Sequence, residues 1–240
     1  GFTLEGYKKV LQDHMIVRSY INTVIYAFSH TALVIILTAL TAYPLTIKDF
    51  PLRKGITVFI TITMFFSGGL IPTYLLVNSL GMVNTVWSLL IPGAMSVYNM
   101  IITRTFFQNT VPKELLEAAQ IDGCSDARYF FNILLPLSQA VISVIALYYA
   151  VGHWNSYFNA LIYVRDARLQ PLQLILRSIL LSTRVSLNEF EDPDLLAGKV
   201  GLEFLVKYAL IVVSSAPIMC LYPFVQKFFA KGVMLGSVKG

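Results

Sequence analysis

The chain has 240 residues, of which 56% are hydrophobic and only 13% are charged, and its mean hydropathy is +0.69. About a quarter of the residues of a typical soluble domain are charged. This composition excludes an ordinary water-soluble domain and predicts a membrane protein. The net charge of +5 is spread along the chain without a basic stripe, so we expect no nucleic-acid partner.

The sequence carries no pattern typical of a catalytic or metal site. Cys124 and Cys220 are far apart and have no second cysteine or histidine at ligand spacing, which argues against a disulfide or a metal. A phosphate-binding GxxxxGK[ST] loop, an HExxH pair and a GxSxG turn are all absent. We therefore expect neither a catalytic residue nor a cofactor on this chain, and no ATP hydrolysis by it.

Long stretches without charge predict an all-α bundle of membrane helices. A helix crosses a bilayer with about 20 apolar residues. The stretch Gly55–Thr103 is long enough for two helices, with a turn at Asn78–Asn84, and Gly68 and Gly69 favour a kink in the first of them. Together the predicted spans number five and lie at Ser19–Ile47, at Gly55–Thr103 as two helices, at Leu137–Val164 and at Leu202–Gln226.

The short loops predict the orientation of these spans. The Lys48–Lys54 loop is basic and the Asn78–Asn84 turn has no charge, so the first is expected in the cytoplasm. The predicted layout is an extracytoplasmic segment 1–18, a membrane domain 19–226 with a cytoplasmic segment 104–136 and an extracytoplasmic loop 165–199, and a cytoplasmic tail 227–240. This places residue 1 outside, an arrangement that suggests a further helix before it.

The segment PKELLEAAQIDGCSDARYFFNILLP, residues 112–136, predicts two helices joined by a tight turn. Pro112 suits the first turn of a helix, Gly123 ends that helix, and Ser125 is a candidate N-cap for the second. Apolar side chains give each helix one face to bury, made of Leu115, Ala118 and Ala119 in the first and of Tyr129, Phe130, Ile133 and Leu134 in the second.

The same segment resembles the EAA loop of permeases from binding-protein-dependent ABC importers. That pattern has EAA, three residues, Gly, nine residues and I-x-L-P, and it is matched here by Glu117-Ala118-Ala119, Gly123 and Ile133–Pro136. Asp122, before the glycine, is the usual companion. The resemblance implies that Glu117, Ala118, Ala119, Asp122, Gly123 and Pro136 dock on an ATPase subunit and transmit its closure to the membrane helices.

Stretches outside this segment, among them TMFFSGGLIPTYLLVNSLGMVNT and GHWNSYFNALIY, resemble the maltose-type carbohydrate permeases, within them the LplC/YtcP and alginate-importer branch. The resemblance covers essentially the whole chain. It implies the MetI-like fold of type I ABC importers in the bacterial cytoplasmic membrane, and six spans rather than five. It also implies four kinds of partner: a second homologous permease, two ATPase subunits that hold ATP and Mg²⁺, an extracytoplasmic solute-binding protein and a saccharide substrate.

Aromatic and amide side chains near the outer end of the fourth span are candidates for the substrate path. Carbohydrates bind to aromatic faces and to amides that pair with hydroxyls. The candidates are Trp154, Asn155, Tyr157 and Asn159, with Tyr98, Asn99 and Tyr148 as further ones. An interfacial aromatic belt, core packing and helix–helix hydrogen bonds are the structural alternatives for these residues.

Two other functions fit parts of the sequence. An importer of the same kind could carry a peptide, phosphate or a polyamine, because the EAA loop is common to all of them. An ion-driven secondary sugar transporter would need acidic residues inside the membrane and an internal repeat. The predicted spans contain no Asp or Glu except Glu203 near an end, and that residue and Lys207 are spaced as a structural ion pair.

Overall fold

The computed structural model describes residues 3–189, 204–221 and 223, with the backbone alone described at 110, 113 and 182–189. Within these residues the secondary structure is helical, without a strand. This confirms the predicted all-α class. The Glu203–Lys207 pair, the end of the loop 165–199 and the tail 227–240 lie wholly or partly outside the described residues.

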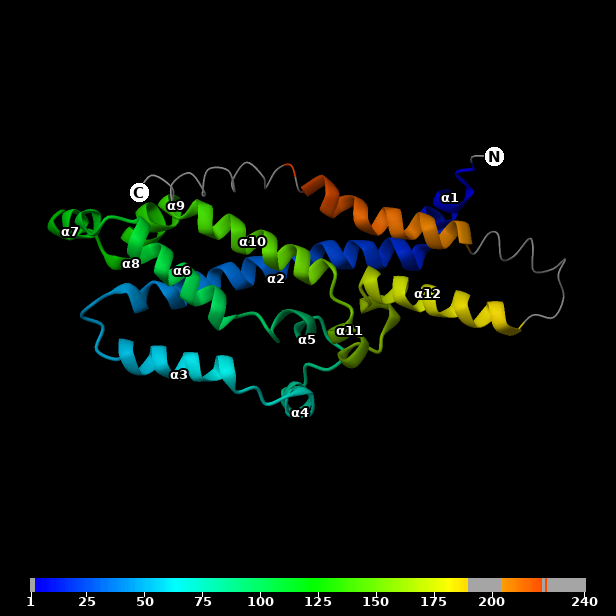
Figure 1. The fold of residues 1–240 in the computed structure, drawn as a ribbon, viewed down its shortest axis with the longest axis horizontal. Coiled ribbons are helices and arrows are strands. Elements are labelled where there is room, and N and C mark those ends of the chain that lie inside the picture. The colour runs from blue at the N-terminus through cyan, green and yellow to red at the C-terminus, as the bar shows by residue number, and fades with distance from the viewer. Residues whose placement is uncertain (1–2, 190–203, 222, 224–240) are drawn as a thin grey trace. The chain divides into compact units, whose positions relative to one another are not determined.

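The chain forms two compact units, each assembled from distant parts of the sequence. Of the described residues, one unit comprises those within 1–29, 74–91 and 151–221, and the other comprises those within 30–73 and 92–150, with 223. Two long helices, α2 (His14–Ala42) and α10 (Gln139–Trp154), contribute residues to both units (Figure 1). We refer to the two as the first unit and the second unit.

The first long helix starts earlier than the predicted Ser19. A short helix, α1 (Glu5–Gln12), precedes it, and α2 then begins at His14. Asp13 explains this start, because its Oδ1 accepts hydrogen bonds from the N–H groups of Met15 at 2.8 Å and Ile16 at 3.2 Å. This N-cap satisfies backbone donors that the helix itself leaves free. The helical stretch ends with η1 (Pro44–Thr46), close to the predicted Ile47.

The second predicted span is a broken helix. Its halves are α3 (Arg53–Phe65) and α4 (Leu70–Ser79), and the helix axis bends by 117° between them. Gly69 at the break has a φ of +82°, which a residue without Cβ adopts freely. The kink predicted at the two glycines is thus confirmed, and so is the turn that follows, since α4 ends at Ser79.

The third predicted span, by contrast, is not a continuous helix. It consists of α5 (Trp87–Leu90) and α6 (Val97–Thr110), and the backbone between them is irregular. Pro92 cannot donate a backbone hydrogen bond, and Gly93 has a φ of +76°. An uncharged sequence thus concealed a helix break that these two residues cause.

After α6 the chain forms α7 (Lys113–Ile121), α8 (Asp126–Tyr129), the π-helical turn η2 (Phe130–Leu134) and α9 (Leu135–Leu137) before α10. It continues with α11 (Phe158–Tyr163), η3 (Ala167–Leu169) and α12 (Leu172–Glu189). A helix at Phe204–Leu221 covers the described part of the fifth predicted span. The helix α12 corrects our reading of 165–199 as a plain polar loop.

Two helices of the described chain are long and apolar enough to cross a membrane, His14–Thr46 and Phe204–Leu221. Two bent pairs, α3 with α4 and Asp126–Leu137 with α10, raise the number to four if each pair forms one span. Broken helices occur in membranes where protein or a cavity satisfies the freed backbone groups.

Each unit has its own apolar core. In the second unit, side chains from α2, α6, α7 and the α8–α9 stretch pack together around Met100, Phe107 and Phe130. In the first unit, one cluster joins Val10 and Ile16 to Leu172 and Leu210, so that α12 packs through its buried face. A second cluster there contains Tyr26, Leu89, Ala160, Val164 and Leu174.

Candidate functional site

The predicted helix–turn–helix of residues 112–136, which we name the coupling segment, is present. Its first helix, α7, begins at Lys113, and Pro112 is the N-cap residue. Gly123 follows the helix with a φ of +70°, as predicted for the residue that ends it. Its N–H donates to the Gln120 carbonyl at 3.0 Å, and the Cys124 N–H donates to that of Ala119 at 2.8 Å. These two bonds form a Schellman cap, which fixes the end of the helix.

The two faces of α7 differ from our expectation. Ala119 is buried and Leu116 half-buried, and both pack in the core of the second unit. Leu115 and Ala118, predicted to share the buried face with Ala119, are exposed. Ile121 is 87% exposed. Residues three apart lie on the same side of a helix, so Leu116 and Ala119 share an apolar face toward the core. Leu115, Ala118 and Ile121 share a second apolar face that is exposed.

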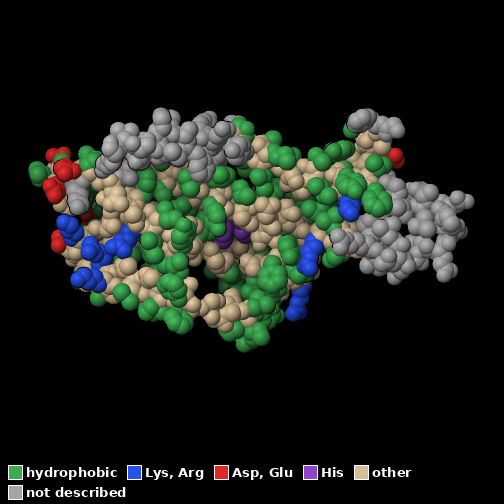
Figure 2. Space-filling model, viewed as in Figure 1, with side chains coloured by type: hydrophobic (Ala, Val, Ile, Leu, Met, Phe, Trp, Pro, Cys, Tyr) green, Lys and Arg blue, Asp and Glu red, His purple; other side chains and the backbone are tan. Residues whose placement is uncertain are grey.

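The charged members of the coupling segment lie on its surface. The side chains of Glu117 and Asp122 are exposed, and Figure 2 shows acidic side chains over this end of the second unit with basic side chains beside them. Arg104 of α6 lies near Arg53, close enough for their charges to interact. Arginines at this end agree with the predicted cytoplasmic location of the segment.

The second half of the coupling segment is anchored in the core. The Ser125 side chain accepts a hydrogen bond from the Arg128 N–H at 3.4 Å, so the predicted N-cap is confirmed. Tyr129, Phe130 and Leu134 are buried, with Ile133 packed against the same core, as the pattern predicts. The ring of Phe130 lies 5.2 Å from that of Tyr43, near the end of α2. Pro136 is exposed in α9, before a bend of 77°.

Trp154 does not offer the exposed aromatic face that we expected. Its side chain is only 5% exposed, and its Nε1–H donates to the Ser214 carbonyl at 2.9 Å. The ring also meets that of Tyr20 edge to face, with centroids 5.7 Å apart. The indole therefore packs α10 against α2 and the Phe204–Leu221 helix inside the first unit. Asn155 is exposed, and its amide donates to the Val151 carbonyl of its own helix at 2.9 Å.

Tyr157, in the turn between α10 and α11, has an aromatic contact that the sequence did not suggest. The Cζ atom of Arg177, on α12, lies 4.7 Å from the centroid of the Tyr157 ring. This is a cation–π contact, since such pairs lie within about 6 Å. The tyrosine remains 37% exposed and Arg177 is half-buried. Arg177 is a candidate that we missed, because nothing in the local pattern links the two residues.

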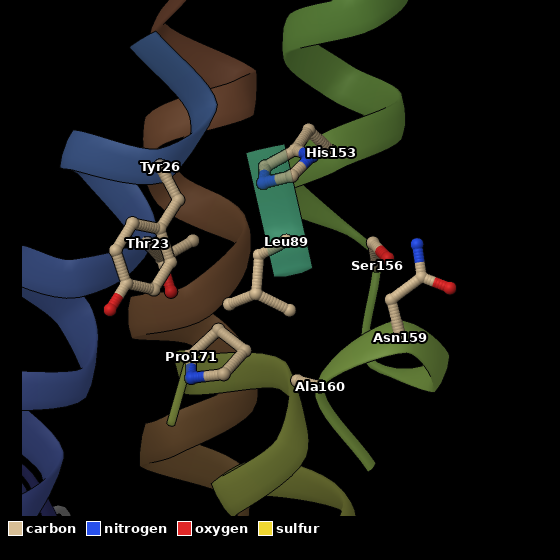
Figure 3. A pocket seen from close by; sticks show the side chains of 8 residues that line it. All are labelled: Thr23, Tyr26, Leu89, His153, Ser156, Asn159, Ala160 and Pro171. Atoms are coloured by element: carbon tan, nitrogen blue, oxygen red, sulfur yellow. The ribbon is translucent and has the colours of Figure 1, made fainter. Parts of the chain in front are cut away.

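Asn159 lines a small cavity with residues from four elements of the first unit. Its walls are Thr23, Tyr26, Leu89, His153, Ser156, Asn159, Ala160 and Pro171 (Figure 3). The cavity measures about 10 Å³, enough for about one water molecule. It is therefore too small for a sugar ring in this conformation. Figure 3 also shows the Asn159 amide directed away from Leu89.

The remaining substrate-path candidates belong to the second unit. Tyr98 is 60% exposed, Asn99 is buried, and Tyr148 is 70% exposed with its ring edge-on to that of Tyr149. The seven candidates thus fall into two groups, each described within its own unit. Trp154, Asn155, Tyr157 and Asn159 share one stretch of chain, and Tyr98 is adjacent to Asn99 in another.

A second feature that the sequence did not reveal is a clamp at Asn84. This residue has a φ of +60°, and its Oδ1 accepts hydrogen bonds from the N–H groups of Arg165 at 2.9 Å and Asp166 at 2.8 Å. Its own N–H donates to the Tyr163 carbonyl at 2.8 Å. We predicted a turn here but not this contact, which ties the turn to the end of α11.

Comparison with known proteins identifies the class. Residues 19–234 match the model of the family described as the binding-protein-dependent transport system inner membrane component. The chain belongs to this family. The permease is therefore a membrane component of a transport system, and this confirms the resemblance stated above. The family assignment favours the importer over an ion-driven secondary transporter, and it is consistent with a transport subunit that is not the catalytic one.

Individual relatives agree with this assignment. The permease is 40% identical to the Bacillus subtilis polygalacturonan/rhamnogalacturonan transport system permease protein YtcP and 43% identical to the LplC protein of the same organism. Both alignments cover all of this chain, and they cover 82% of the length of YtcP and 80% of the length of LplC. A permease from a bacterial ABC transporter that imports the acidic polysaccharide alginate has a similar structure. It gives a TM-score of 0.84 at 29% identity, over 95% of this chain and 80% of that one.

Proposed function

We propose that this permease forms a heterodimer with a homologous permease and moves an oligo- or polysaccharide that a solute-binding protein delivers. Two partner ATPase subunits would bind ATP and Mg²⁺ and supply the energy, and the permease itself would hold no cofactor. The family, the resemblance to the EAA pattern and the geometry of the coupling segment support this proposal.

The observation that carries the proposal is the two-faced helix α7. Its inner face, with Ala119, is fixed in the core of the second unit, and its outer face presents Leu115, Ala118 and Ile121. An exposed apolar face on a capped helix is a surface that a protein partner can cover. Glu117 and Asp122 beside it offer charged contacts to the ATPase.

The same geometry explains how a movement at this surface would reach the membrane helices. The Schellman cap holds the end of α7, and the α8–α9 stretch that follows is buried through Tyr129 and Phe130. These rings pack against Tyr43 near the end of α2. Packed interiors transmit displacement because they leave little free volume. Closure of the ATPase would thus displace α2 together with α7.

The carbohydrate cargo rests on the relatives. Besides the permeases named above, the chain is 29% identical over 92% of its length to the melibiose/raffinose/stachyose import permease protein MelC of Bacillus subtilis. A phosphate ester is the second candidate, because the sn-glycerol-3-phosphate transport system permease protein UgpE of Rhizobium meliloti is 27% identical over 90% of this chain. None of the relatives named above is described as a peptide or polyamine permease.

The orientation is also part of the proposal. We place the coupling segment and the C-terminus in the cytoplasm, and the Asn84 clamp with the start of α12 outside, in the bacterial cytoplasmic membrane. The basic residues around Arg53 and Arg104 support this assignment through the positive-inside rule.

The test uses the complete complex, purified through a tag on this permease and placed in proteoliposomes with its binding protein. We expect oligogalacturonate to stimulate ATP hydrolysis in the wild type. Glu117→Lys should abolish this stimulation, because it reverses the charge at the docking surface. Asp49→Lys, an equal charge change at an exposed position of the Lys48–Lys54 loop, serves as the control and should keep it. Full stimulation in Glu117→Lys would contradict the coupling role.

A further inference from the structure

Arg177 is held in place by an aromatic ring within the first unit. Its guanidinium lies over the Tyr157 ring at 4.7 Å, and the side chain is half-buried. Tyr157 is itself fixed, because its backbone carbonyl accepts the Leu161 N–H at 2.9 Å in the first turn of α11. A guanidinium that stacks on a ring keeps its N–H donors free along its edges. The contact therefore orients the arginine without using its hydrogen-bonding capacity.

No carboxylate neutralises Arg177 among the residues that the structure describes. Within the described residues, Arg168 forms an ion pair with Asp166 at a distance of 2.8 Å, and Arg177 takes no part in it. The helix α11 and the part of α12 up to Leu181 contain no acidic residue at all. Figure 2 shows basic side chains where Figure 1 draws α11 and the start of α12. Within the part of the chain that the structure describes, the arginine thus brings an uncompensated charge to a largely apolar surface.

An anion is the ligand that this arrangement suits. A planar guanidinium pairs with a carboxylate through two parallel hydrogen bonds, and such charge-assisted bonds are stronger than neutral ones. Two other side chains of the turn, Asn155 and Ser156, and Asn159 on α11 carry amide or hydroxyl groups, which suit a ligand with many hydroxyls. A sugar acid combines both groups, whereas a phospholipid offers a phosphate on an apolar tail.

We propose that Arg177, seated on Tyr157, binds the carboxylate of an acidic saccharide on its way through the permease. This inference rests on the proposed saccharide cargo and narrows it to uronate-containing chains. Tyr157 acts as a positioning residue, because its ring holds the guanidinium above it. Arg177 is the residue that distinguishes an acidic sugar from a neutral one.

The experiment compares the uptake of trigalacturonate with that of its methyl ester, which lacks the charge. Both are supplied with saturating binding protein to the complete complex in phosphatidylcholine vesicles. Arg177→Gln should lower trigalacturonate uptake by about tenfold or more, the factor expected for losing a hydrogen bond between charged groups. Uptake of the ester should stay unchanged. Arg177→Lys keeps the charge but not the paired N–H donors of the guanidinium. Its uptake of trigalacturonate should lie between that of the wild type and that of Arg177→Gln.

Controls separate this role from a structural one. Arg168→Gln removes an arginine that already pairs with Asp166, and it should leave the ratio of acid to ester uptake at the wild-type value. If Arg177→Gln lowers the uptake of both sugars equally, or of neither, the inference is wrong. It is also wrong if the effect appears only when phosphatidylglycerol is added to the vesicles, because the ligand is then a lipid headgroup. A wild-type complex that takes up neither sugar would contradict the saccharide cargo itself.

Discussion

The coupling segment and the stretch from Trp154 to Arg177, which we name the α11 segment, are held together in different ways. In the first, the bonds that fix Gly123 and Ser125 join residues three to five positions apart. In the second, Trp154 bonds a carbonyl 60 residues away, and the N–H of Arg165 bonds an oxygen 81 residues away. Local bonds survive when neighbouring elements move, whereas distant ones hold only while the unit stays folded.

This difference fits the tasks that we assign to the two regions. A docking helix must keep its shape while it transmits a displacement, and a Schellman cap provides that shape locally. A substrate path must bring side chains from several elements together, as Tyr157 and Arg177 are. The predictions below test this contrast, from the largest expected effect to the smallest.

The largest effect is expected at the cap of α7. Gly123→Pro should abolish transport, because proline cannot adopt the φ of +70° and cannot donate to the Gln120 carbonyl. Gly123→Asn should keep most of the activity, since asparagine tolerates the left-handed conformation. Stimulated ATP hydrolysis, normalised to the amount of permease in the membrane, measures both. Equal activity of the two variants would show that the cap has no part in coupling.

Loss of stability, rather than of selectivity, is expected at Trp154. Trp154→Ala leaves a cavity and strands the Ser214 carbonyl, at a cost of about 3–5 kcal/mol for a buried aromatic residue. The chain offers a matched control in Trp87, which is 59% exposed. Trp87→Ala should change the thermal stability of the purified complex far less. If Trp154→Ala unfolds at the wild-type temperature but transports less, the residue contacts the cargo after all.

A smaller change is expected at the Asn84 clamp. Asn84→Ala removes the acceptor of two exposed hydrogen bonds, and at a φ of +60° it replaces asparagine, which tolerates the left-handed conformation, by alanine, which does not. Each of these two effects costs about 1 kcal/mol. Asn84→Asp keeps an acceptor oxygen and should behave like the wild type. Faster proteolytic cleavage near Arg165 in the alanine variant, and not in the aspartate variant, would support the clamp.

The smallest effect concerns the exposed ion pair of Asp166. Hydrogen bonds from Arg168 lower the pKa of Asp166 below its ordinary value of 3.8. The pair therefore contributes stability above that value and loses it as the pH falls through the lowered pKa. The difference in thermal stability between wild type and Asp166→Asn should be small and constant from about pH 5 to about pH 8. A difference in thermal stability that grows as the pH falls would contradict the lowered pKa of Asp166.

The sequence predicted the coupling segment well because its structure depends on neighbouring residues. Gly123, Ser125 and the buried stripe of Tyr129 and Phe130 were each recognisable from spacing alone. What failed was the orientation of α7. Both of its apolar faces look alike in the sequence, and only the packing of Ala119 against the core decides which one is buried.

The helix boundaries were harder to predict where no charge marks them. The break at Pro92 and Gly93 lies inside a run without charge, and α12 was hidden in a stretch with balanced charge. The contacts of the α11 segment could not be predicted at all. The partner of Trp154 is a backbone carbonyl, which every residue has, so no residue type reveals it.

The proposed docking surface can be tested most directly with a single cysteine at Ile121, the most exposed apolar residue of the coupling segment. Cys124 is less suitable, because it is half-buried beside the cap. In a permease with both native cysteines changed to alanine, Ile121→Cys should cross-link to the ATPase subunit and resist an impermeant thiol reagent added from outside. The control is Leu80→Cys, at a residue that is 62% exposed in the turn after α4. This cysteine should react with the reagent added from outside and should not cross-link to the ATPase subunit. If Ile121→Cys reacts only with lipid or with the outside reagent, the coupling role and the orientation proposed here are both wrong.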